Sequence, residues 1–257
     1  MLIILLDKRK ILTYTIAALV IVLVFGWANY LSLDLMQVVS QNTKQIPIYS
    51  VETPDKKVAL TFDCAWGAED MPGILETLRK ENIKATFFIV GSWVDKYPEV
   101  VKAIAREGHD IANHSDTHQY MSQISYEKMR EEISSTATKM EKLLGKRTEL
   151  FRAPYGDYNS KVLMAAAEEK HYTIQWDVDS LDWKDISLGD IRERVRSRVK
   201  SGSIVLLHNG TKYTASALQL LIKDLKESGY SFVPVSQLIM RENYYVDATG
   251  RQYEVKN

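Results

Sequence analysis

This sequence has almost no cysteine and no excess of charge of either sign. Cys64 is the only cysteine among 257 residues, which excludes an intrachain disulfide. Lys and Arg together number 33, and so do Asp and Glu, so the formal net charge is zero. A chain without excess positive charge has no broad basic face to attract nucleic acid. We therefore expect no nucleic-acid partner.

The remaining composition is that of an ordinary globular protein. Hydrophobic residues make up 46% and charged residues 26% of the chain. Its 257 residues are enough for one large domain with its own core, which we expect to be monomeric. No low-complexity tract or fixed-period repeat interrupts it, so the pattern does not indicate a repeat array.

The amino-terminal stretch has a long uncharged run. Residues 11–33 contain no charged side chain, and a helix of that length, at about 1.5 Å per residue, covers roughly the 30 Å hydrocarbon layer of a membrane. Lys8, Arg9 and Lys10 precede the run, which favours a cytoplasmic segment 1–10, a single-pass anchor and an extracytoplasmic remainder. A cleaved signal peptide is the alternative, although residues 25–28 lack a clean cleavage pattern.

Two less regular segments flank the main domain. Residues 34–55 have no clear hydrophobic period and contain two prolines, which predicts a linker or an extended arm lying on the domain. Residues 241–257 form a tail in which Ala248, Thr249 and Gly250 separate two aromatic-rich stretches. This pattern predicts a small C-terminal hairpin.

Between these segments, residues 56–240 alternate short β-rich runs with longer runs of helical period. The seven runs expected as strands are 58–62, 85–90, 109–112, 149–151, 172–176, 203–207 and 231–233. The segments expected as helices are 69–81, 97–107, 125–144, 158–170, 188–200, 215–228 and 235–240. The alternation predicts an α/β fold with a parallel sheet, either a seven-unit barrel or an open doubly wound sheet.

Polar residues follow five of the seven predicted strands, and this favours the barrel, whose chemistry collects at the carboxyl ends of its strands. The segments are Asp63, His114–His118, Arg152–Gly156, Asp177–Trp183 and His208. Taken singly, each has a plain structural interpretation: a helix cap, surface histidines, a βα turn, a solvated acidic loop or a core histidine. Their joint placement at one rim of the barrel indicates a site.

The residue types suit metal and acid–base chemistry. His114 and His118 are four residues apart, so both can lie on one face of a helical turn and bind one metal ion. Arg152 can hold a carboxylate in a fixed orientation. His208, near carboxylates, is a candidate acid or base. An indole such as that of Trp183 stacks well on sugar faces.

These five segments, in this order, resemble the motifs of the polysaccharide deacetylase family, also called the NodB-homology or carbohydrate esterase 4 family. They read Thr61-Phe62-Asp63-Cys64, His114-Ser115-Asp116-Thr117-His118, Arg152-Ala153-Pro154-Tyr155-Gly156, Asp179-Ser180-Leu181-Asp182-Trp183 and Val205-Leu206-Leu207-His208. The resemblance covers about residues 56–240 and implies a distorted (β/α)7 barrel. The Cys-Ala-Trp-Gly run also resembles the sporulation-type branch of the family.

The resemblance implies four catalytic residues. Asp63 would be the general base, and Arg152 would steer it. His208 would be the general acid, with Asp179 as its orienting partner.

Metal and substrate residues are implied in the same way. His114 and His118 would bind a divalent ion, which we expect to be Zn²⁺, with Co²⁺ or another divalent ion as the alternative. Tyr155 would help to bind the oxyanion through its backbone N–H, Trp183 would form a wall of the substrate groove, and Asp182 would contact the substrate.

Cys64 departs from the family pattern, which has a second Asp at this position as third metal ligand. Its thiolate could bind the metal and favour Zn²⁺, water could take its place at a two-histidine site, or the metal site could be lost in a pseudo-enzyme. Because Asp63, Arg152 and both metal-site histidines are retained, we favour an active site with an altered metal preference and keep Cys64 as a candidate ligand.

The resemblance thus implies a metal-dependent hydrolase of carbon–nitrogen bonds that removes N-acetyl groups from an acetylated amino-sugar polymer, such as peptidoglycan, outside the cell membrane. The alternative is a catalytically weak or inactive glycan-binding pseudo-deacetylase of the cell envelope.

Overall fold

The computed structural model describes residues 19–23, 26 and 46–255. The chain divides into two compact units, Met1–Lys44 and Gln45–Asn257, and the described residues of the first unit are helical. Within the described ranges, no helix has both the length and the apolar character needed to cross a membrane. The predicted cytoplasmic segment 1–10 and most of the predicted anchor 11–33 lie outside these ranges.

A parallel sheet forms the centre of the second unit, which confirms the predicted α/β class. Its strands lie in the order β6-β5-β4-β3-β2-β8-β7, with β9 paired to the start of β2. Their bounds are β2 (Lys57–Cys64), β3 (Thr86–Ile89), β4 (Asp110–Asn113), β5 (Leu150–Phe151), β6 (Tyr172–Thr173), β7 (Val178–Asp179), β8 (Ile204–His208) and β9 (Ser231–Phe232). Every pairing among them is parallel.

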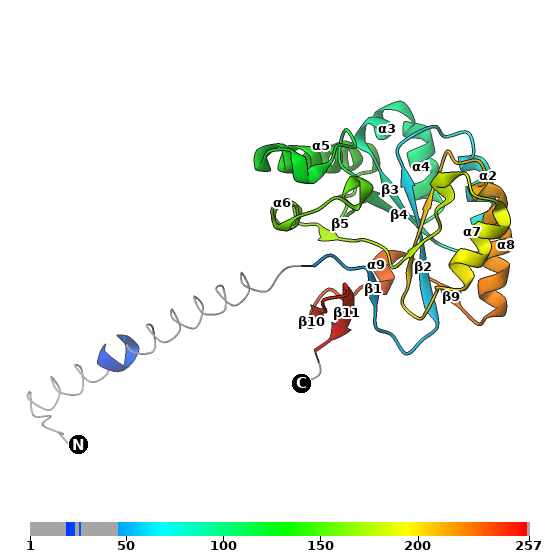
Figure 1. The fold of residues 1–257 in the computed structure, drawn as a ribbon. Coiled ribbons are helices and arrows are strands. Elements are labelled where there is room, and N and C mark those ends of the chain that lie inside the picture. Colours follow the sequence, from blue (N-terminus) through cyan, green and yellow to red (C-terminus); the bar gives the residue numbers. More distant parts are fainter. Residues whose placement is uncertain (1–18, 24–25, 27–45, 256–257) are drawn as a thin grey trace, which may run out of the picture. The chain divides into compact units, whose positions relative to one another are not determined.

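The sheet curls into a half-barrel and, among the described residues, no pairing joins its end strands β6 and β7 (Figure 1). The chain before β2 lies near this opening. Ile48 forms a parallel bridge to Ile174, and Ser50, in β1 (Ser50–Val51), forms an antiparallel bridge to Ser203. Ile48 is buried, so this apolar side chain anchors the arm. The described part of segment 34–55 is therefore an extended arm lying on the domain.

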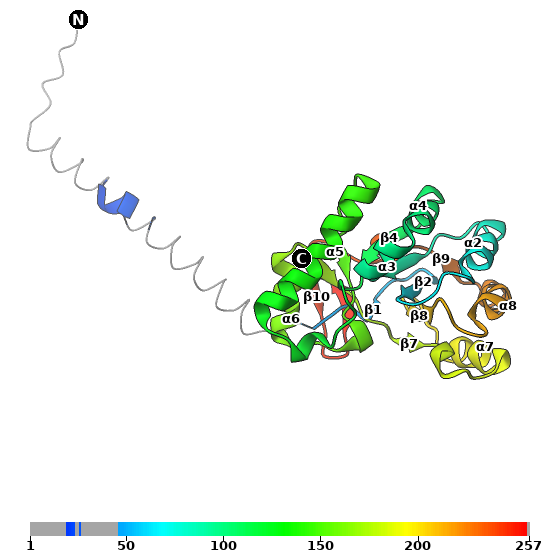
Figure 2. The same ribbon diagram turned by 90° about the horizontal axis from the view of Figure 1, so that it is seen from above.

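Most helices surround the curled sheet on its outer side (Figure 2), whereas the last and shortest helix packs in the inner apolar cluster. The helices are α2 (Met71–Lys80), α3 (Gly91–Lys96), α4 (Pro98–Arg106), α5 (Tyr126–Leu144), α6 (Ser160–Glu168), α7 (Leu188–Arg196), α8 (Thr214–Glu227) and α9 (Val235–Leu238). Each predicted helix is present, and α3 is an additional one. Their apolar residues recur every three or four positions, as Met129, Ile133, Ala137 and Met140 do on α5, so one face of the helix is buried.

Side chains along β2 point alternately to the two faces of the sheet, and this divides the core into two layers. Phe62 and Cys64 pack among the helices outside the sheet, in a cluster that includes Met71 of α2. Ala59, on the opposite face of β2, packs inside the curl with Phe88. Thr61 and Asp63 share the face of Ala59 by the same two-residue period. The strand therefore directs Asp63 inward and Cys64 outward.

The predicted C-terminal hairpin is confirmed. β10 (Tyr244–Val246) and β11 (Arg251–Glu254) pair antiparallel, and β11 also pairs in parallel with β1, which gives a separate three-stranded sheet. The buried amide of Gln252 holds this sheet to the end of the main domain, since it both accepts from and donates to the backbone of Met240, at 2.9 and 2.8 Å.

Candidate active site

The polar segments meet at the carboxyl ends of the parallel strands. Asp63 and His208 are register partners on the neighbouring strands β2 and β8. His114 follows β4 and Arg152 follows β5, and these two strands pair through their last residues. Because parallel strands end at the same edge of a sheet, the four side chains are brought to one rim, as the sequence predicted.

A fully buried guanidinium fixes Asp63. Arg152 Nη1 donates to Asp63 Oδ1 at 2.6 Å and to Thr61 Oγ1 at 2.9 Å, while Nη2 donates to the carbonyl oxygen of Gln175 at 3.0 Å. The guanidinium carbon also lies 3.9 Å from the ring centre of Phe88. Burial raises the pKa of Asp63, but the charge and hydrogen bond of Arg152, together with the nearby His114 and His208, outweigh it and the pKa is lowered. Asp63 is therefore held as a carboxylate.

The backbone of Arg152 sets the tautomer of His114. The carbonyl oxygen of Arg152 lies 2.8 Å from His114 Nδ1, so Nδ1 carries the proton and donates it, leaving a lone pair on Nε2. That Nε2 atom lies 3.5 Å from Asp63 Oδ2. Burial lowers the pKa of His114, so its ring is neutral. A neutral imidazole fixed through its other nitrogen is the usual form of a metal ligand.

His118 lies beside His114, with 5.1 Å between the ring centres. Burial lowers its pKa to about 4, and its buried Nδ1 atom has no hydrogen-bond partner within the described residues. Two neutral imidazoles next to the carboxylate of Asp63, one with an unpartnered nitrogen, match the donor chemistry of a divalent transition-metal site. The residues present therefore fit a metal ion bound by two histidines.

Cys64 does not contribute to this donor set. Its side chain is fully buried in the outer apolar cluster, and its thiol lies 3.9 Å from the carbonyl oxygen of Phe62. Burial raises the pKa of the Cys64 thiol well above its usual range, which opposes the thiolate that a metal requires. The prediction of Cys64 as a metal ligand is therefore wrong, and no cluster of three or more His, Cys, Asp or Glu side chains suited to a metal occurs in the described ranges.

Asp182, and not Asp179, is the partner of His208. Asp182 Oδ1 lies 2.8 Å from His208 Nδ1, Oδ2 accepts from the His208 backbone N–H at 2.8 Å, and Oδ2 also accepts from Thr214 Oγ1 at 2.5 Å. Burial opposes protonation of His208, but the hydrogen bond and the charge of Asp182, with smaller effects of the Asp63 and Asp179 charges, outweigh it, so the pKa of His208 is raised.

The roles predicted for Asp179 and Asp182 therefore both need correction. Asp182 was expected to contact the substrate, but it is fully buried and its carboxylate is occupied by His208 and Thr214. Asp179, expected to orient His208, instead accepts from the backbone N–H of Leu181 at 2.8 Å and shapes the turn. Leu181 has a φ of +56°, and Asp182, directly after this turn, takes the position that the resemblance had implied for Asp179.

Four exposed aromatic side chains lie on the motif loops or directly beside them. Trp66 is 63%, Tyr120 48%, Tyr155 52% and Trp183 53% exposed. The His118 ring meets Trp66 and Tyr155 edge-on, at centre distances of 4.9 and 4.6 Å, and Tyr155 stacks on Tyr120 at 4.1 Å. Trp66 and Tyr120 were not among the predicted residues, although each lies two positions beyond a motif residue.

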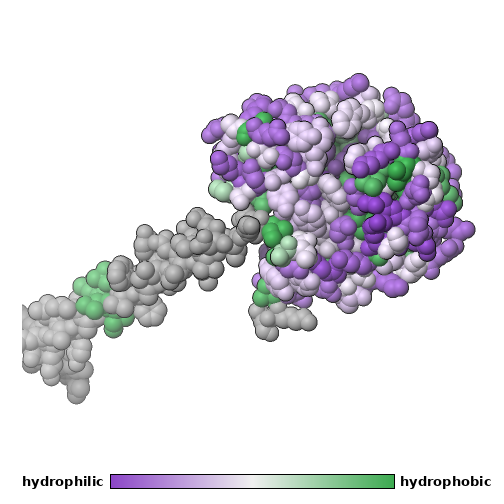
Figure 3. All heavy atoms as spheres, viewed as in Figure 1, coloured by the Kyte–Doolittle hydropathy of each residue, from purple (hydrophilic) through white to green (hydrophobic). Residues whose placement is uncertain are grey.

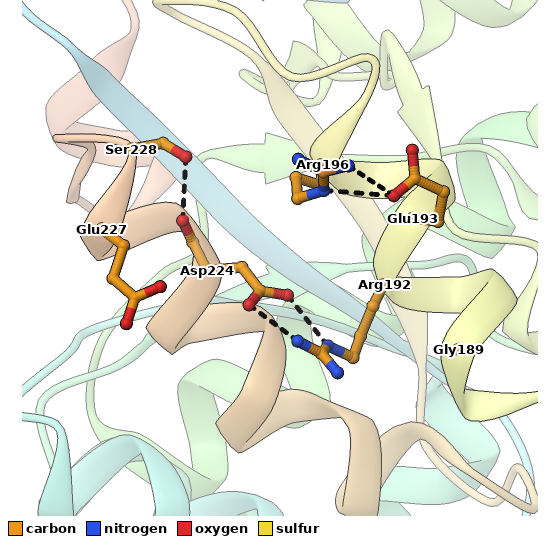
Figure 4. Close-up of a pocket in the computed structure, with 7 residues that line it drawn as sticks. All are labelled: Gly189, Arg192, Glu193, Arg196, Asp224, Glu227 and Ser228. Carbon is orange, nitrogen blue, oxygen red and sulfur yellow. Dashed lines mark hydrogen bonds and ion pairs between the residues drawn. The ribbon is translucent and has the colours of Figure 1, made fainter.

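The cavity in Figure 4 contains none of these residues. Its volume is about 460 Å³ and its lining consists of Gly189, Arg192, Glu193, Arg196, Asp224, Glu227 and Ser228. Arg192 pairs with Asp224 at 2.8 Å, and Arg196 pairs with Glu193 at 2.7 Å. Because these charges neutralise each other, no role is assigned to this cavity.

The molecular face in Figure 3 is mostly polar, with apolar residues in small groups.

Known proteins are similar to this chain in sequence and in fold. The sequence model of the polysaccharide deacetylase family matches residues 50–174. A peptidoglycan-N-acetylglucosamine deacetylase of Bacillus cereus is 35% identical over 196 residues, covering 74% of this chain and 71% of the relative. The uncharacterized protein YlxY of Bacillus subtilis is 34% identical over 193 residues, and the match spans 75% of this chain but only 60% of YlxY.

Among solved structures, wild-type BA3943 of Bacillus anthracis, described as a pseudoenzyme of carbohydrate esterase family 4, is similar with a TM-score of 0.74. It is 32% identical, and the match covers 83% of this chain and 75% of BA3943. A BA3943 mutant described as having restored enzymatic activity gives a TM-score of 0.73 at 35% identity, over 77% of this chain and 72% of the mutant. This chain therefore belongs to the polysaccharide deacetylase family.

Proposed function

We propose that this chain is a carbon–nitrogen hydrolase that removes N-acetyl groups from amino sugars of peptidoglycan or a related cell-wall polymer. The observation that carries the proposal is the pairing of two prepared groups on adjacent strands: Asp63 held by Arg152, and His208 held by Asp182. Asp63 is prepared to accept a proton, and His208 is prepared to donate one. The peptidoglycan deacetylases among the curated relatives support the substrate class.

Asp63 serves as the general base. Its lowered pKa keeps it ionised near neutral pH, and Arg152 occupies Oδ1, which leaves Oδ2 free to accept a proton from an attacking water. The 3.5 Å gap between Oδ2 and His114 Nε2 is longer than a hydrogen bond, so this oxygen is not committed to the imidazole.

His208 serves as the general acid. A raised pKa favours the protonated ring, and the Asp182 contact uses Nδ1, so Nε2 is the atom that donates a proton to the leaving amine. Loss of the amine without a proton would expel an unstable anion, which is why amide hydrolysis needs an acid at this position.

His114 and His118 would hold a divalent ion, and imidazole ligands favour Zn²⁺ or Co²⁺ over harder ions. When bound, such an ion supplies Lewis-acid chemistry toward the acetamide carbonyl. Tyr155, whose backbone has a φ of +59°, would direct its N–H toward the developing oxyanion. Trp183 supplies an exposed indole to stack against a sugar ring.

A second function, a glycan-binding pseudo-deacetylase, is favoured by one observation. Cys64 faces away from the site, so the chain offers two histidine ligands and lacks a third ligand at that position. Its structural similarity to BA3943 fits this alternative. We keep the enzyme as the main proposal because the base, its arginine, the acid and its aspartate are all in place.

For the cellular setting, we propose that residues 11–33 anchor the chain in the cell membrane and that the deacetylase domain, about residues 56–240, acts outside it as a monomer. The uncharged run after Lys8, Arg9 and Lys10 supports this arrangement. Protease protection of the full chain in membrane vesicles of known orientation would test it, since an internal domain would be protected where an external one is cleaved.

Acetate release separates the two functions. The full chain, supplied with Zn²⁺ and acetylated peptidoglycan, should release acetate, and a chelator or Asp63→Asn should abolish the release. Glycan binding that survives chelation, with no acetate released by the unmodified chain under either Zn²⁺ or Co²⁺, would favour the pseudo-deacetylase. A folded Asp63→Asn variant with unchanged activity would contradict the assignment of the base.

A further inference from the structure

A buried carboxylate lies behind the loop that carries the histidine pair. Glu132, in the middle of α5, is only 1% exposed, although its neighbour Glu131 has a side chain that is 67% exposed. Glu132 sits on the apolar face of α5, next to Ile133 and one turn from Met129. A carboxylate there loses its hydration, so its retention indicates contacts that an apolar side chain could not make.

The shortest of those contacts reach the segment between the two histidines. Glu132 Oε2 accepts from the backbone N–H groups of Asp116 and Thr117, at 2.9 and 2.8 Å. Oε1 accepts from Thr117 Oγ1 at 2.8 Å and from Gln119 Nε2 at 3.3 Å. Lys128 Nζ lies 3.5 Å from Oε1. Every partner is a donor or a cation, so the whole carboxylate is engaged.

The loop that Glu132 holds has an unfavourable backbone. Ser115 has a φ of +65° and His118 a φ of +59°, the left-handed region that side chains other than glycine rarely adopt. Such conformations persist only where surrounding contacts fix them. The two N–H groups that Glu132 accepts lie between these residues, so its carboxylate clamps the centre of the strained segment. Ser115 Oγ adds a second contact by accepting from the His118 N–H at 3.1 Å.

We infer that Glu132 is the positioning residue of the histidine pair: by binding the 116–117 backbone, it fixes the position of His118 relative to His114. His114 needs no such help, because the carbonyl oxygen of Arg152 already fixes its ring. His118 has no comparable contact of its own, since its Nδ1 atom is unpartnered among the described residues. The role in metal binding rests on the proposed function, whereas the role in ordering the loop does not.

Two measurements on the full chain test this inference. The first is amide hydrogen exchange of residues 114–119, and the second is Co²⁺ affinity from its visible absorption. In a folded Glu132→Ala variant we expect exchange of this segment to accelerate at least about tenfold while the strands keep their protection. We expect Co²⁺ affinity to fall by about 10- to 100-fold, the usual effect of losing a group that orients a ligand.

Two further variants serve as controls, and a third repeats the test with a smaller change. Glu131→Ala removes the adjacent exposed carboxylate and should leave both readouts within about threefold of the unmodified chain. Glu132→Gln keeps an oxygen that can accept both N–H groups and should retain most of the protection. Glu132→Asp keeps the charge but shortens the reach, so it should lose protection and affinity, and it carries the test if the alanine variant does not fold.

The outcomes are distinct. A folded Glu132→Ala or Glu132→Asp variant with normal exchange at 114–119 would overturn the inference. Loop exchange that accelerates while Co²⁺ affinity stays unchanged would also overturn it, because Glu132 would then order the loop without fixing His118 for metal binding. If the unmodified chain binds no Co²⁺, the metal-dependent function fails, and accelerated loop exchange in Glu132→Ala would still support the clamp.

Discussion

Replacing Asp182 with Asn removes a single negative charge beside His208 and keeps the side-chain shape. In the native chain, that charge and its hydrogen bond raise the pKa of His208 against the effect of burial. Without them only the charges of Asp63 and Asp179 oppose the effect of burial, so the pKa of His208 should fall. Because the acid works in its protonated form, activity declines as pH rises through this pKa. The alkaline limb of the rate profile should therefore move to lower pH.

The size of the effect follows from the geometry. Asp182 is fully buried, and its two oxygens accept from three donors on His208 and Thr214. A positioned general acid contributes about 10²- to 10⁴-fold to a rate, so Asp182→Asn should lower kcat about 10²- to 10³-fold near pH 7. Loss of a hydrogen bond to a charged partner should lower the free energy of unfolding by about 1.5–3 kcal/mol, which a folded domain can tolerate.

Asp179→Asn is the matched control, since Asp179 lies three positions away, makes its side-chain hydrogen bond to the turn at Leu181 and acts on His208 only through a weaker charge effect than that of Asp182. It should keep kcat within about threefold and move the alkaline limb much less than Asp182→Asn does, because Asp179 makes no hydrogen bond to His208. The assay is acetate release between pH 5 and 10, with an NMR titration of the His208 ring as a second readout. The reasoning is refuted if Asp182→Asn keeps the native profile, or if Asp179→Asn loses as much activity.

Further predictions concern the arginine, the thiol and the groove wall. Arg152→Met leaves the Asp63 carboxylate buried without its partner and should cost about 3–5 kcal/mol in urea unfolding; a cost under about 1 kcal/mol would contradict the buried pair. Cys64→Ala should leave Zn²⁺ affinity within about threefold, and Cys64 should resist thiol reagents until the chain unfolds; rapid labelling of the folded chain would show an accessible thiol. Trp183→Ala should raise KM for glycan about two- to tenfold, equivalent to 0.5–1.5 kcal/mol of stacking, with a smaller change in kcat. Tyr245→Ala, at an exposed residue of β10, is its control, and an equal effect there would remove the specific role of Trp183.

Hydrophobic period was sufficient to predict most of the fold. The apolar run of β2 and the spaced apolar residues of α5 each fall within two residues of their predicted bounds. α3 was missed because its six residues are too few to show a helical period. β7 was missed because its two residues belong to a polar loop and are held by pairing with β8, a contact between distant parts of the sequence.

The candidate site was predictable where the strand itself aims the side chain. Asp63 and His208 end their strands in register, so their approach follows from the parallel sheet alone. The same argument could have excluded Cys64, because consecutive residues of a strand point to opposite faces. The family motif suggested Cys64 as a ligand, but the two-residue period of the strand directs its side chain away from the site.

Loop residues were harder to assign. The choice between Asp179 and Asp182 depends on the positive φ of Leu181, which no hydrophobic pattern encodes. Glu132 did have a signal, since it is a charged residue on the buried face of α5. Its target, however, is the backbone of a loop whose shape depends on two residues with positive φ, which no sequence period encodes.

Metal stoichiometry tests the central claim most directly, namely that His114 and His118 form a two-histidine metal site beside a prepared base. After loading with Zn²⁺ and dialysis, elemental analysis of the full chain should find about one Zn²⁺ per chain, reduced to a trace in His114→Ala and His118→Ala and unchanged in Cys64→Ala. A substoichiometric value for the unmodified chain, or full occupancy after either histidine is replaced, would contradict the account.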